Sequence, residues 1–312
     1  MEDHDISPSL MARAQFEDSR RRWRRNAFWR GVLVTFGVLI ALGAVGAWLG
    51  AGRHFSPHIA HVSIHGTIFD EPARTALLRD LRDAETAKAV LLDIDSPGGT
   101  TVGAETIYLL MREIAETRPV VAVLGEVAAS GGYVAALSAD HVVARGNTLT
   151  GSIGVIMEYP NMTSLLERVG VEVETVRSSP LKAEPSPFRT PNAAGTAAQE
   201  ALVADAFAWF EGLVAERRDL AGADLAAVTD GRVMTGRMAL EAGLIDAIGG
   251  RETALDWLQN EDETLRDLPV YEWAPEREAA GLLPGVTAWM LKLGGIANPS
   301  GKTGPKLLSI LN

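Results

Sequence analysis

The sequence predicts an α/β fold in which helices cover a mostly parallel sheet. Three observations predict it: strand-like and helix-like segments alternate along the chain, the strand-like segments are almost continuously apolar, and glycine-rich turns follow them. Strands that are buried on both faces lose the polar alternation of a half-exposed sheet. A chain of 312 residues, 47% of them hydrophobic, is long enough to bury such a core.

The expected elements begin at residue 60. A strand is predicted over 60–66, and a helix over 74–83 follows it. Residues 88–95 read KAVLLDID, an apolar run of strand length that ends in the turn S-P-G-G. The next segment carries apolar residues at helical spacing, which are Ile107, Leu110, Met111 and Ile114. This order of strand, helix, strand and helix is typical of parallel sheets.

Three further strands and two further helices are predicted after residue 118. The strands cover 119–124, 141–144 and 171–176, and the helices cover 131–139 and 193–218. One face of the long helix carries Leu202, Ala206, Trp209, Phe210 and Leu213. This face could cover the core or meet a neighbouring subunit, and we favour the core.

The pattern weakens after residue 260. Residues 279–295 could form an amphipathic helix, and residues 296–306 are rich in Gly, Pro, Ser and Lys. We interpret this end as a partly flexible extension over 260–312, which follows a folded domain over 53–259 that opens with a linker at 53–59.

The segment before residue 53 is predicted to anchor the chain in a membrane. Residues 31–52 carry no charged side chain. A helix of that length spans roughly 33 Å, enough for a hydrocarbon core of about 30 Å. Residues 1–30 include seven Arg, so we expect this part in the cytoplasm and residues 53–312 outside. A cleaved signal peptide is disfavoured, because the apolar run and the segment before it are both too long.

Composition excludes several kinds of site. The net charge is −11, and because residues 1–30 carry seven Arg and five acidic residues, the remainder carries −13. An acidic body without a basic stripe argues against nucleic acid as a partner. The chain has no cysteine, which excludes disulfides, thiolate nucleophiles and cysteine-based metal sites. No cofactor or metal site is visible in the sequence.

Three glycine-rich segments are candidates for chemistry, and the third of them along the chain is T-G-S-I-G at residues 150–154. The turn S-P-G-G follows one buried strand, and A-A-S-G-G-Y follows the next and begins a helix. Ligand sites of α/β sheets lie at the carboxyl ends of strands. Ser130 would head the helix, and one amide from each turn could form an oxyanion hole. The alternative is that these segments are only tight turns.

A serine nucleophile needs a base, and histidine is poorly placed to supply one. Only His65 and His141 lie in the expected core, and His141 sits within an apolar strand, where a structural role is favoured. Lys88 begins a strand, at the wrong end, whereas Lys182 follows the strand predicted over 171–176. A lysine acts as a base in its neutral form, which burial can favour, and Ser152 could hold its amine. The alternative for Lys182 is a solvated loop charge.

The order of motifs resembles the signal peptide peptidase A family of serine peptidases, in its short bacterial form. The motifs are S-P-G-G, A-A-S-G-G-Y, T-G-S-I-G-V, a loop lysine before P-S-P-F, then D-G-R-V-M-T-G and G-L-I-D. The resemblance covers about residues 60–255. It implies that Ser130 is the nucleophile, Lys182 its base and Ser152 the residue that orients the lysine. It also implies that Gly99 and Gly131 provide the oxyanion amides.

The resemblance further implies a Clp-protease/crotonase-like fold after one transmembrane helix. It implies a ring of subunits, with an octamer as the expected size, in which Lys182 serves Ser130 of a neighbour. The implied activity is endopeptidase cleavage of signal-peptide remnants or unfolded peptides. Together with the anchor, it implies a single-pass protein of the cytoplasmic (inner) membrane, in contact with lipid, whose catalytic domain lies on the periplasmic or extracellular side.

Three alternatives stay open. One is a crotonase-type enzyme that acts on coenzyme A thioesters, which would need neither Lys182 nor an anchor. Another is a non-catalytic membrane scaffold, and the third is a peptidase that cuts membrane proteins. One departure from the family pattern is D-I-D before S-P-G-G, which adds Asp93 and Asp95 on one face of a strand. These carboxylates could repel each other or begin a metal site, but solvated carboxylates are favoured.

Overall fold

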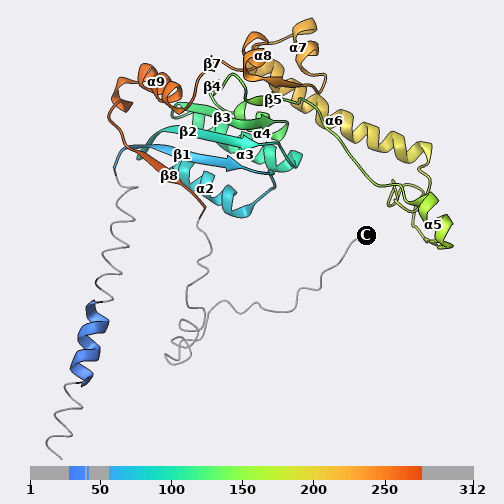
Figure 1. Cartoon of the computed structure of the whole chain (residues 1–312), viewed down its shortest axis with the longest axis horizontal. Coiled ribbons are helices and arrows are strands. Elements are labelled where there is room, and N and C mark those ends of the chain that lie inside the picture. Colours follow the sequence, from blue (N-terminus) through green and yellow to red (C-terminus); the bar gives the residue numbers. More distant parts are fainter. Residues whose placement is uncertain (1–27, 39–40, 42–55, 276–312) are drawn as a thin grey trace, which may run out of the picture.

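The chain folds around one mixed sheet with helices on both faces (Figure 1). The computed structural model describes residues 28–38, 41 and 56–275. Within these residues the sheet has eight strands. Six of them follow the order β6-β5-β3-β2-β1-β8, while β4 pairs with β3 and β7 pairs with β4. All its pairings are parallel except that of β5 with β6. The predicted α/β class with a mostly parallel sheet is therefore confirmed.

The first five described elements after residue 55 alternate as the sequence predicts. They are β1 (His58–His65), α2 (Pro72–Asp83), β2 (Ala87–Ser96), α3 (Thr101–Ala115) and β3 (Val120–Ala129). β1 begins inside the segment expected to be a linker, and its first residue is fully buried. β1, β2 and β3 are adjacent and parallel, so β2 and β3 end at the same edge of the sheet.

β3 is shared between two neighbours. Its first half, from Val121 to Leu124, pairs with β4 (His141–Ala144), whereas Val127 to Ala129 pair with β5 (Leu149–Gly151). The short helix α4 (Gly131–Ala136) follows β3 directly. β5 pairs antiparallel with β6 (Val233–Thr235), and β7 (Ala247–Ile248) pairs with β4. Because the end of β3 pairs with β5, Ser130, which follows β3, lies next to the residues that follow β5.

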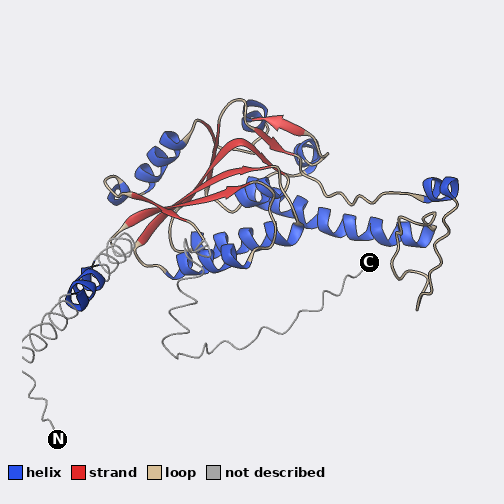
Figure 2. Ribbon diagram, turned by 60° about the horizontal axis from the view of Figure 1, so that its bottom comes forward, coloured by secondary structure: helices blue, strands red, loops and turns tan. Residues whose placement is uncertain are grey.

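The two faces of the sheet carry separate apolar clusters. The larger cluster joins one face of the strands to α2, α3, α4 and the second half of α6 (Ala193–Arg218). The smaller cluster includes Ala254 and Leu258 of α9 (Arg251–Glu261) on the opposite face, as Figure 2 shows. Strands that are covered on both faces need apolar side chains on both, which explains their near-continuous apolar runs.

Helix α6 belongs to the core only in its second half. Phe210, Leu213 and Val214 are buried, whereas Leu202 is 57% exposed. The apolar face predicted to cover the core therefore continues beyond it. In Figure 1 the N-terminal half of α6 extends away from the sheet, and α5 (Thr163–Val169) lies near its far end.

The strand predicted over 171–176 is wrong for this chain. These residues form no regular secondary structure and lie outside the sheet, and Val176 is fully exposed. A strand requires a neighbour that accepts its hydrogen bonds, and the described part of the chain places none beside this segment.

The fold continues beyond residue 259, where the sequence pattern weakens. α7 (Gly222–Val228) and α8 (Gly236–Glu241) precede α9, and a 3-10 turn at Glu263–Leu265 leads to β8 (Val270–Trp273). β8 extends the sheet by pairing parallel to β1. The helix expected over 279–295 and the tail over 296–306 lie outside the described residues.

The predicted membrane helix is described only in part. Residues 28–38 are helical, but most of the remainder of the apolar run at 31–52 lies outside the described residues. In the part of the chain that the structure covers, no helix is both long and apolar enough to cross a membrane.

The G-L-I-D motif at residues 243–246 connects α6 and α4 to the sheet through hydrogen bonds. Asp246 accepts hydrogen bonds from the backbone of Val142 at 2.7 Å and from two guanidinium nitrogens of Arg218 at 2.8 and 3.1 Å. Arg218 also donates to the carbonyl of Gly243. The hydroxyl of Tyr133, which is fully buried in α4, donates to the carbonyl of Leu244 at 2.6 Å.

Asp246→Asn is expected to lower the free energy of unfolding by about 2 kcal/mol at pH 7, because the charged pair with Arg218 is lost. Burial acts to raise the pKa of Asp246, but hydrogen bonds and charge from Arg218 lower it further, below its usual 3.8. The stabilisation is therefore present above the unfolded pKa and is lost as pH falls through the folded value.

Urea unfolding at pH 7 and pH 3 measures both effects, and Asp256→Asn on the exposed side of α9 is the control. The deficit of Asp246→Asn should shrink at pH 3, because the wild type then loses the same stabilisation. An undiminished deficit at pH 3 would contradict this assignment.

Candidate active site

The two glycine-rich turns meet at the edge of the sheet where β2 and β3 end. A Cβ atom placed on Gly98 would lie 2.9 Å from both the backbone nitrogen of Gly131 and Cβ of Ser130. Gly98 also has a φ of +105°, a conformation that side chains strongly disfavour. Glycine is therefore required for this contact between the turns, and the predicted approach of the two motifs is confirmed.

Gly99 lies close to Gly131, because a Cβ atom placed on Gly131 would lie 3.3 Å from the backbone nitrogen of Gly99. The amide of Ile68 donates to the carbonyl of Gly98, and its carbonyl accepts from the amide of Thr100, both at 2.8 Å. Ile68 therefore bonds to the residues before and after Gly99 but not to the amide of Gly99 itself. No described residue accepts a hydrogen bond from the amide of Gly99 or of Gly131, the first residue of α4. Two free amides in adjacent turns can stabilise an oxyanion.

Ser130 stands between β3 and α4 in an unusual backbone conformation. Its φ is +52° and its ψ is −121°, which is rare for a residue with a side chain. Its amide donates to the carbonyl of Gly151 at 2.9 Å, and its carbonyl accepts from the amides of Tyr133 and Val134. Strain of this kind is tolerated where the surroundings enforce it, and it is common at functional sites.

Ser152 follows β5 and shares the pocket with Ser130. It also has a positive φ, +50°, and its amide donates to the carbonyl of Arg232 at 2.8 Å. The preceding residue, Gly151, pairs with Val233 of β6 and with Ala129 of β3. The D-G-R-V segment thus holds the T-G-S segment against the end of β3.

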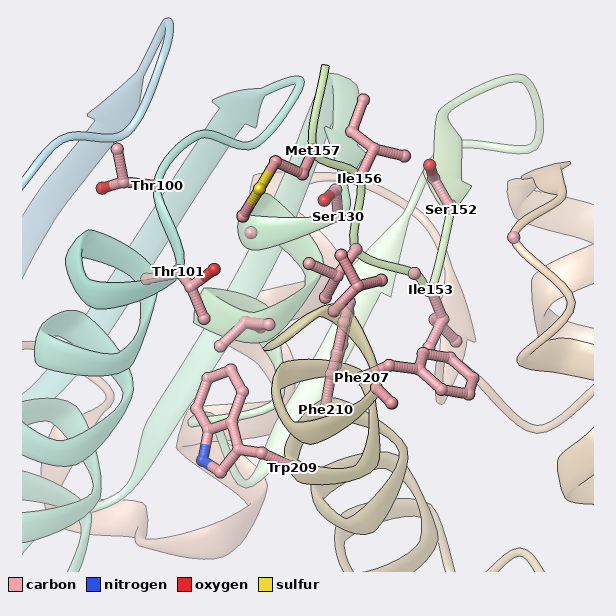
Figure 3. Close-up of a pocket in the computed structure, with 18 of the residues that line it drawn as sticks. Thr100, Thr101, Ser130, Ser152, Ile153, Ile156, Met157, Phe207, Trp209 and Phe210 are labelled. Atoms are coloured by element: carbon pink, nitrogen blue, oxygen red, sulfur yellow. The ribbon is translucent and has the colours of Figure 1, made fainter. Parts of the chain in front are cut away.

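A pocket of about 860 Å³ opens in front of these residues (Figure 3). Gly99, Ser130, Gly131 and Ser152 line it, so four of the five predicted site residues come together. Most of its remaining lining is apolar, and the apolar residues among those labelled in Figure 3 are Ile153, Ile156, Met157, Phe207, Trp209 and Phe210. Apolar pockets with few polar groups are typical of substrate sites.

The pocket is elongated along α6. Its lining extends from Phe210 back to Thr196, which is roughly 21 Å of helix. That length matches about six residues of an extended peptide. The lining also includes the carboxylates Glu200 and Asp230, and Asp230 is paired with Arg232.

Lys182 does not lie among the pocket residues of its own chain. It is exposed, in a turn whose neighbour Glu184 contacts Gly195 and Gln199 in the first two turns of α6. Phe210 lies at the other end of the groove, roughly 22 Å along the helix from Gly195. Within one chain, the structure therefore separates Lys182 from the turn that carries Ser130.

Comparisons with known proteins agree with these motifs. The family model of peptidase family S49 matches residues 112–265, a range that includes Ser130, Ser152 and Lys182. A putative protease of Synechocystis sp. is 39% identical over 201 residues, which cover 64% of this chain and 72% of the relative. This chain belongs to peptidase family S49. It is thereby a protease, and its relatives support serine-protease chemistry.

Two other S49-type relatives are similar over a smaller part of their length. The chloroplastic serine protease SPPA of Arabidopsis thaliana is 36% identical over 182 residues, 57% of this chain and 26% of the relative. A putative signal peptide peptidase SppA of Enterococcus faecium is 35% identical over 197 residues, 63% of this chain and 57% of the relative. The chain thus spans less than two thirds of these two relatives.

The two histidines predicted to lie in the core are placed away from this pocket. The ring of His141 stacks on Trp257 at 4.8 Å and lies 4.0 Å from Asp246, at the start of β4. Burial lowers the pKa of His141. Neither His141 nor His65 lines the pocket. The structural role favoured for His141 fits this packing.

Asp93 and Asp95 have partners outside the pocket. A carboxylate oxygen of Asp93 lies 3.6 Å from Nε2 of His61, and this neighbour lowers the pKa of Asp93. Asp95 accepts a hydrogen bond from the amide of Val127 at 3.1 Å. Neither residue lines the pocket. In the described part of the chain, no three His, Asp or Glu side chains form a group that could hold a metal ion.

Sequence reasoning missed the wall that α6 contributes. Val203, Ala204 and Phe207 line the groove although the helical face was assigned to the core. Each lies one or two residues from Leu202 or Ala206 of the predicted face, so the breadth of that face was a usable signal. The strain at Ser130 has no sequence signal beyond its position between a strand and a helix.

Replacing Ser130 by glycine should relieve strain, whereas replacing it by alanine should not. We expect Ser130→Gly to be about 1 kcal/mol more stable than Ser130→Ala, because glycine adopts the positive φ readily. Both variants should lack protease activity. Chemical unfolding of the two proteins measures the difference.

Ser164 on the exposed side of α5 is the matched control. There the order should reverse, because alanine favours helices over glycine by about 1 kcal/mol. A Ser130→Ala protein more stable than Ser130→Gly would argue against strain at this position.

Proposed function

We propose that this S49 protein is a membrane-anchored serine endopeptidase with a Ser–Lys dyad. Ser130 is its nucleophile, Lys182 its general base and Ser152 the residue that orients the lysine. The observation that carries the proposal is the position of Ser130, at a strained turn, beside two free amides and at the wall of an apolar groove. These are the components that acyl transfer requires.

The proposed reaction proceeds through an acyl-enzyme. The hydroxyl of Ser130 loses its proton to the neutral amine of Lys182 and attacks the peptide carbonyl. The amides of Gly99 and Gly131 donate to the oxygen as it becomes negative. The protonated lysine returns the proton to the leaving amine, and water then hydrolyses the ester with the lysine again as base.

Lys182 is proposed to act on Ser130 of a neighbouring subunit. Its separation from the pocket of its own chain supports this arrangement, and so does the exposed apolar surface of the segment that carries it. That surface includes Ile156, Leu165, Val169, Val171 and Val176. A closed ring of copies, an octamer by resemblance, would bury these residues and surround the lysine with apolar groups, which favour a neutral amine.

The proposed substrates are signal-peptide remnants and other extended apolar peptides. The groove is mainly apolar, and its length suits about six extended residues. Residues 153–157 line the pocket together with Ser130 and pair with no strand in the described structure, so a peptide could add to them as a strand. The apolar run at 31–52 would hold this groove near the outer surface of the cytoplasmic membrane.

The dyad is tested with the full-length protein in detergent and a fluorogenic signal-peptide substrate. Ser130→Ala should reduce kcat by about 10³-fold or more, and Lys182→Ala by about 10²-fold or more, with unchanged oligomer size. Lys88→Ala, on the opposite edge of the sheet, is the matched control. Wild-type cleavage by Lys182→Ala would overturn the dyad.

Mixed oligomers test whether the dyad is shared. The two inactive variants are co-expressed with different tags and purified through both tags. A shared dyad should restore about a quarter of wild-type activity, because some neighbouring pairs then combine an intact Ser130 with an intact Lys182. A dyad within one chain predicts no recovery at all.

A further inference from the structure

The turn that carries Lys182 is built on one buried carboxylate. The side chain of Glu184 is only 3% exposed, although its neighbours in the turn are on the surface. Arg177 and Arg189 both donate to its Oε1 atom, at 2.5 and 2.8 Å. The carboxylate of Glu184 therefore binds one arginine that precedes Lys182 in the sequence and one that follows it.

The same two arginines also hold the backbone on each side of Lys182. Arg177 donates to the carbonyl of Pro180 at 2.8 Å, and Arg189 makes a longer contact of 3.5 Å to the carbonyl of Ala183. The amide of Lys182 closes the turn on the carbonyl of Ser179 at 3.2 Å. The backbone of the lysine is thus fixed before, at and after its position.

Glu184 also joins this turn to α6. Its carbonyl accepts from the side-chain amide of Gln199 at 3.1 Å. Its Cβ lies so close to Gly195 that a side chain there would approach it to 3.0 Å. Because Phe210, further along the same helix, is anchored in the core, the turn has a fixed place relative to the sheet.

The cluster is a costly way to gain stability. A buried carboxylate loses its hydration, and a buried ion cluster is often no more stable than apolar residues in its place. The Oε2 atom of Glu184 is buried and has no hydrogen-bond partner among the described residues. Hydrogen bonds from Arg189 and then Arg177 lower the pKa of Glu184, so the carboxylate is charged at neutral pH.

We propose that Glu184 is a positioning residue for Lys182, which acts by holding Arg177 and Arg189 against the backbone that flanks the lysine. This inference rests on the proposed Ser130–Lys182 dyad. Its consequence is that the amine approaches the serine of the neighbouring subunit from a rigid turn. A displacement of about 1 Å in such a group can reduce a rate by about 10²-fold.

The test compares Glu184→Gln with Glu184→Asp in the full-length oligomer. Glutamine keeps the shape but loses the charge that holds two guanidinium groups, so kcat per active site should fall by about 10-fold or more, with KM within about twofold. Aspartate keeps the charge and should recover part of the loss. Glu174→Gln, on an exposed carboxylate of the same segment, should behave as wild type.

Active sites are counted by labelling Ser130 to completion with a fluorophosphonate. A merely structural role would lower the number of active sites or the thermal midpoint but leave kcat per site unchanged, and that result would overturn the proposal. If Glu184→Gln does not assemble, Arg189→Lys decides. Lysine keeps the charge but lacks the planar guanidinium, one terminal nitrogen of which contacts both the carboxylate of Glu184 and the carbonyl of Ala183. A lowered kcat therefore supports the proposal, and a wild-type kcat overturns it.

Lys182→Ala in the same assay separates the two proposals. If Lys182→Ala is inactive while Glu184→Gln has the kcat of wild type, only the role of Glu184 is overturned. If Lys182→Ala cleaves at the wild-type rate, the dyad fails, and the role of Glu184 fails with it.

Discussion

The site depends on one steric constraint, the close contact between the turn after β2 and the residue after β3. Gly98 lies so near Ser130 and Gly131 that no side chain fits between them. This contact brings the free amides of two turns together and leaves Ser130 no relaxed backbone conformation. Two interactions hold this contact in place. They are the parallel pairing of β2 with β3 and the hydrogen bond from the amide of Ser130 to the carbonyl of Gly151.

Most of the sheet could be predicted because its strands carry their own signal. β2 and the first part of β3 are apolar runs between helices, the pattern that covered parallel strands require, and β1 shows the alternation of a strand. β8 was not predicted, because four residues between Pro269 and Pro275 resemble a loop until β1 is placed beside them. Residues 171–176 failed for the opposite reason: they have the composition of a strand, but pairing depends on a neighbour that local sequence does not reveal.

The site was predictable where it is local. Gly99, Ser130, Gly131 and Ser152 lie within a few residues of strand ends, and neighbouring strand ends meet. The place of Lys182 could not be predicted, because it depends on how far α6 extends from the core. The contacts that Glu184 makes next to Lys182 could not be predicted for a similar reason. Charges at 177, 184 and 189 look like ordinary surface residues until the turn folds them onto one carboxylate.

The extension of α6 has a consequence for how this family member can change in length. The helix is rooted in the core near Phe210 and carries the lysine turn on Gly195 and Gln199. An insertion or deletion of one residue between these points would move the turn by about 1.5 Å and rotate it by about 100°. Substitutions along this stretch leave the turn in place, whereas changes in residue number move Lys182 relative to the core. The number of residues in the N-terminal half of α6 is therefore constrained more tightly than the identity of those residues.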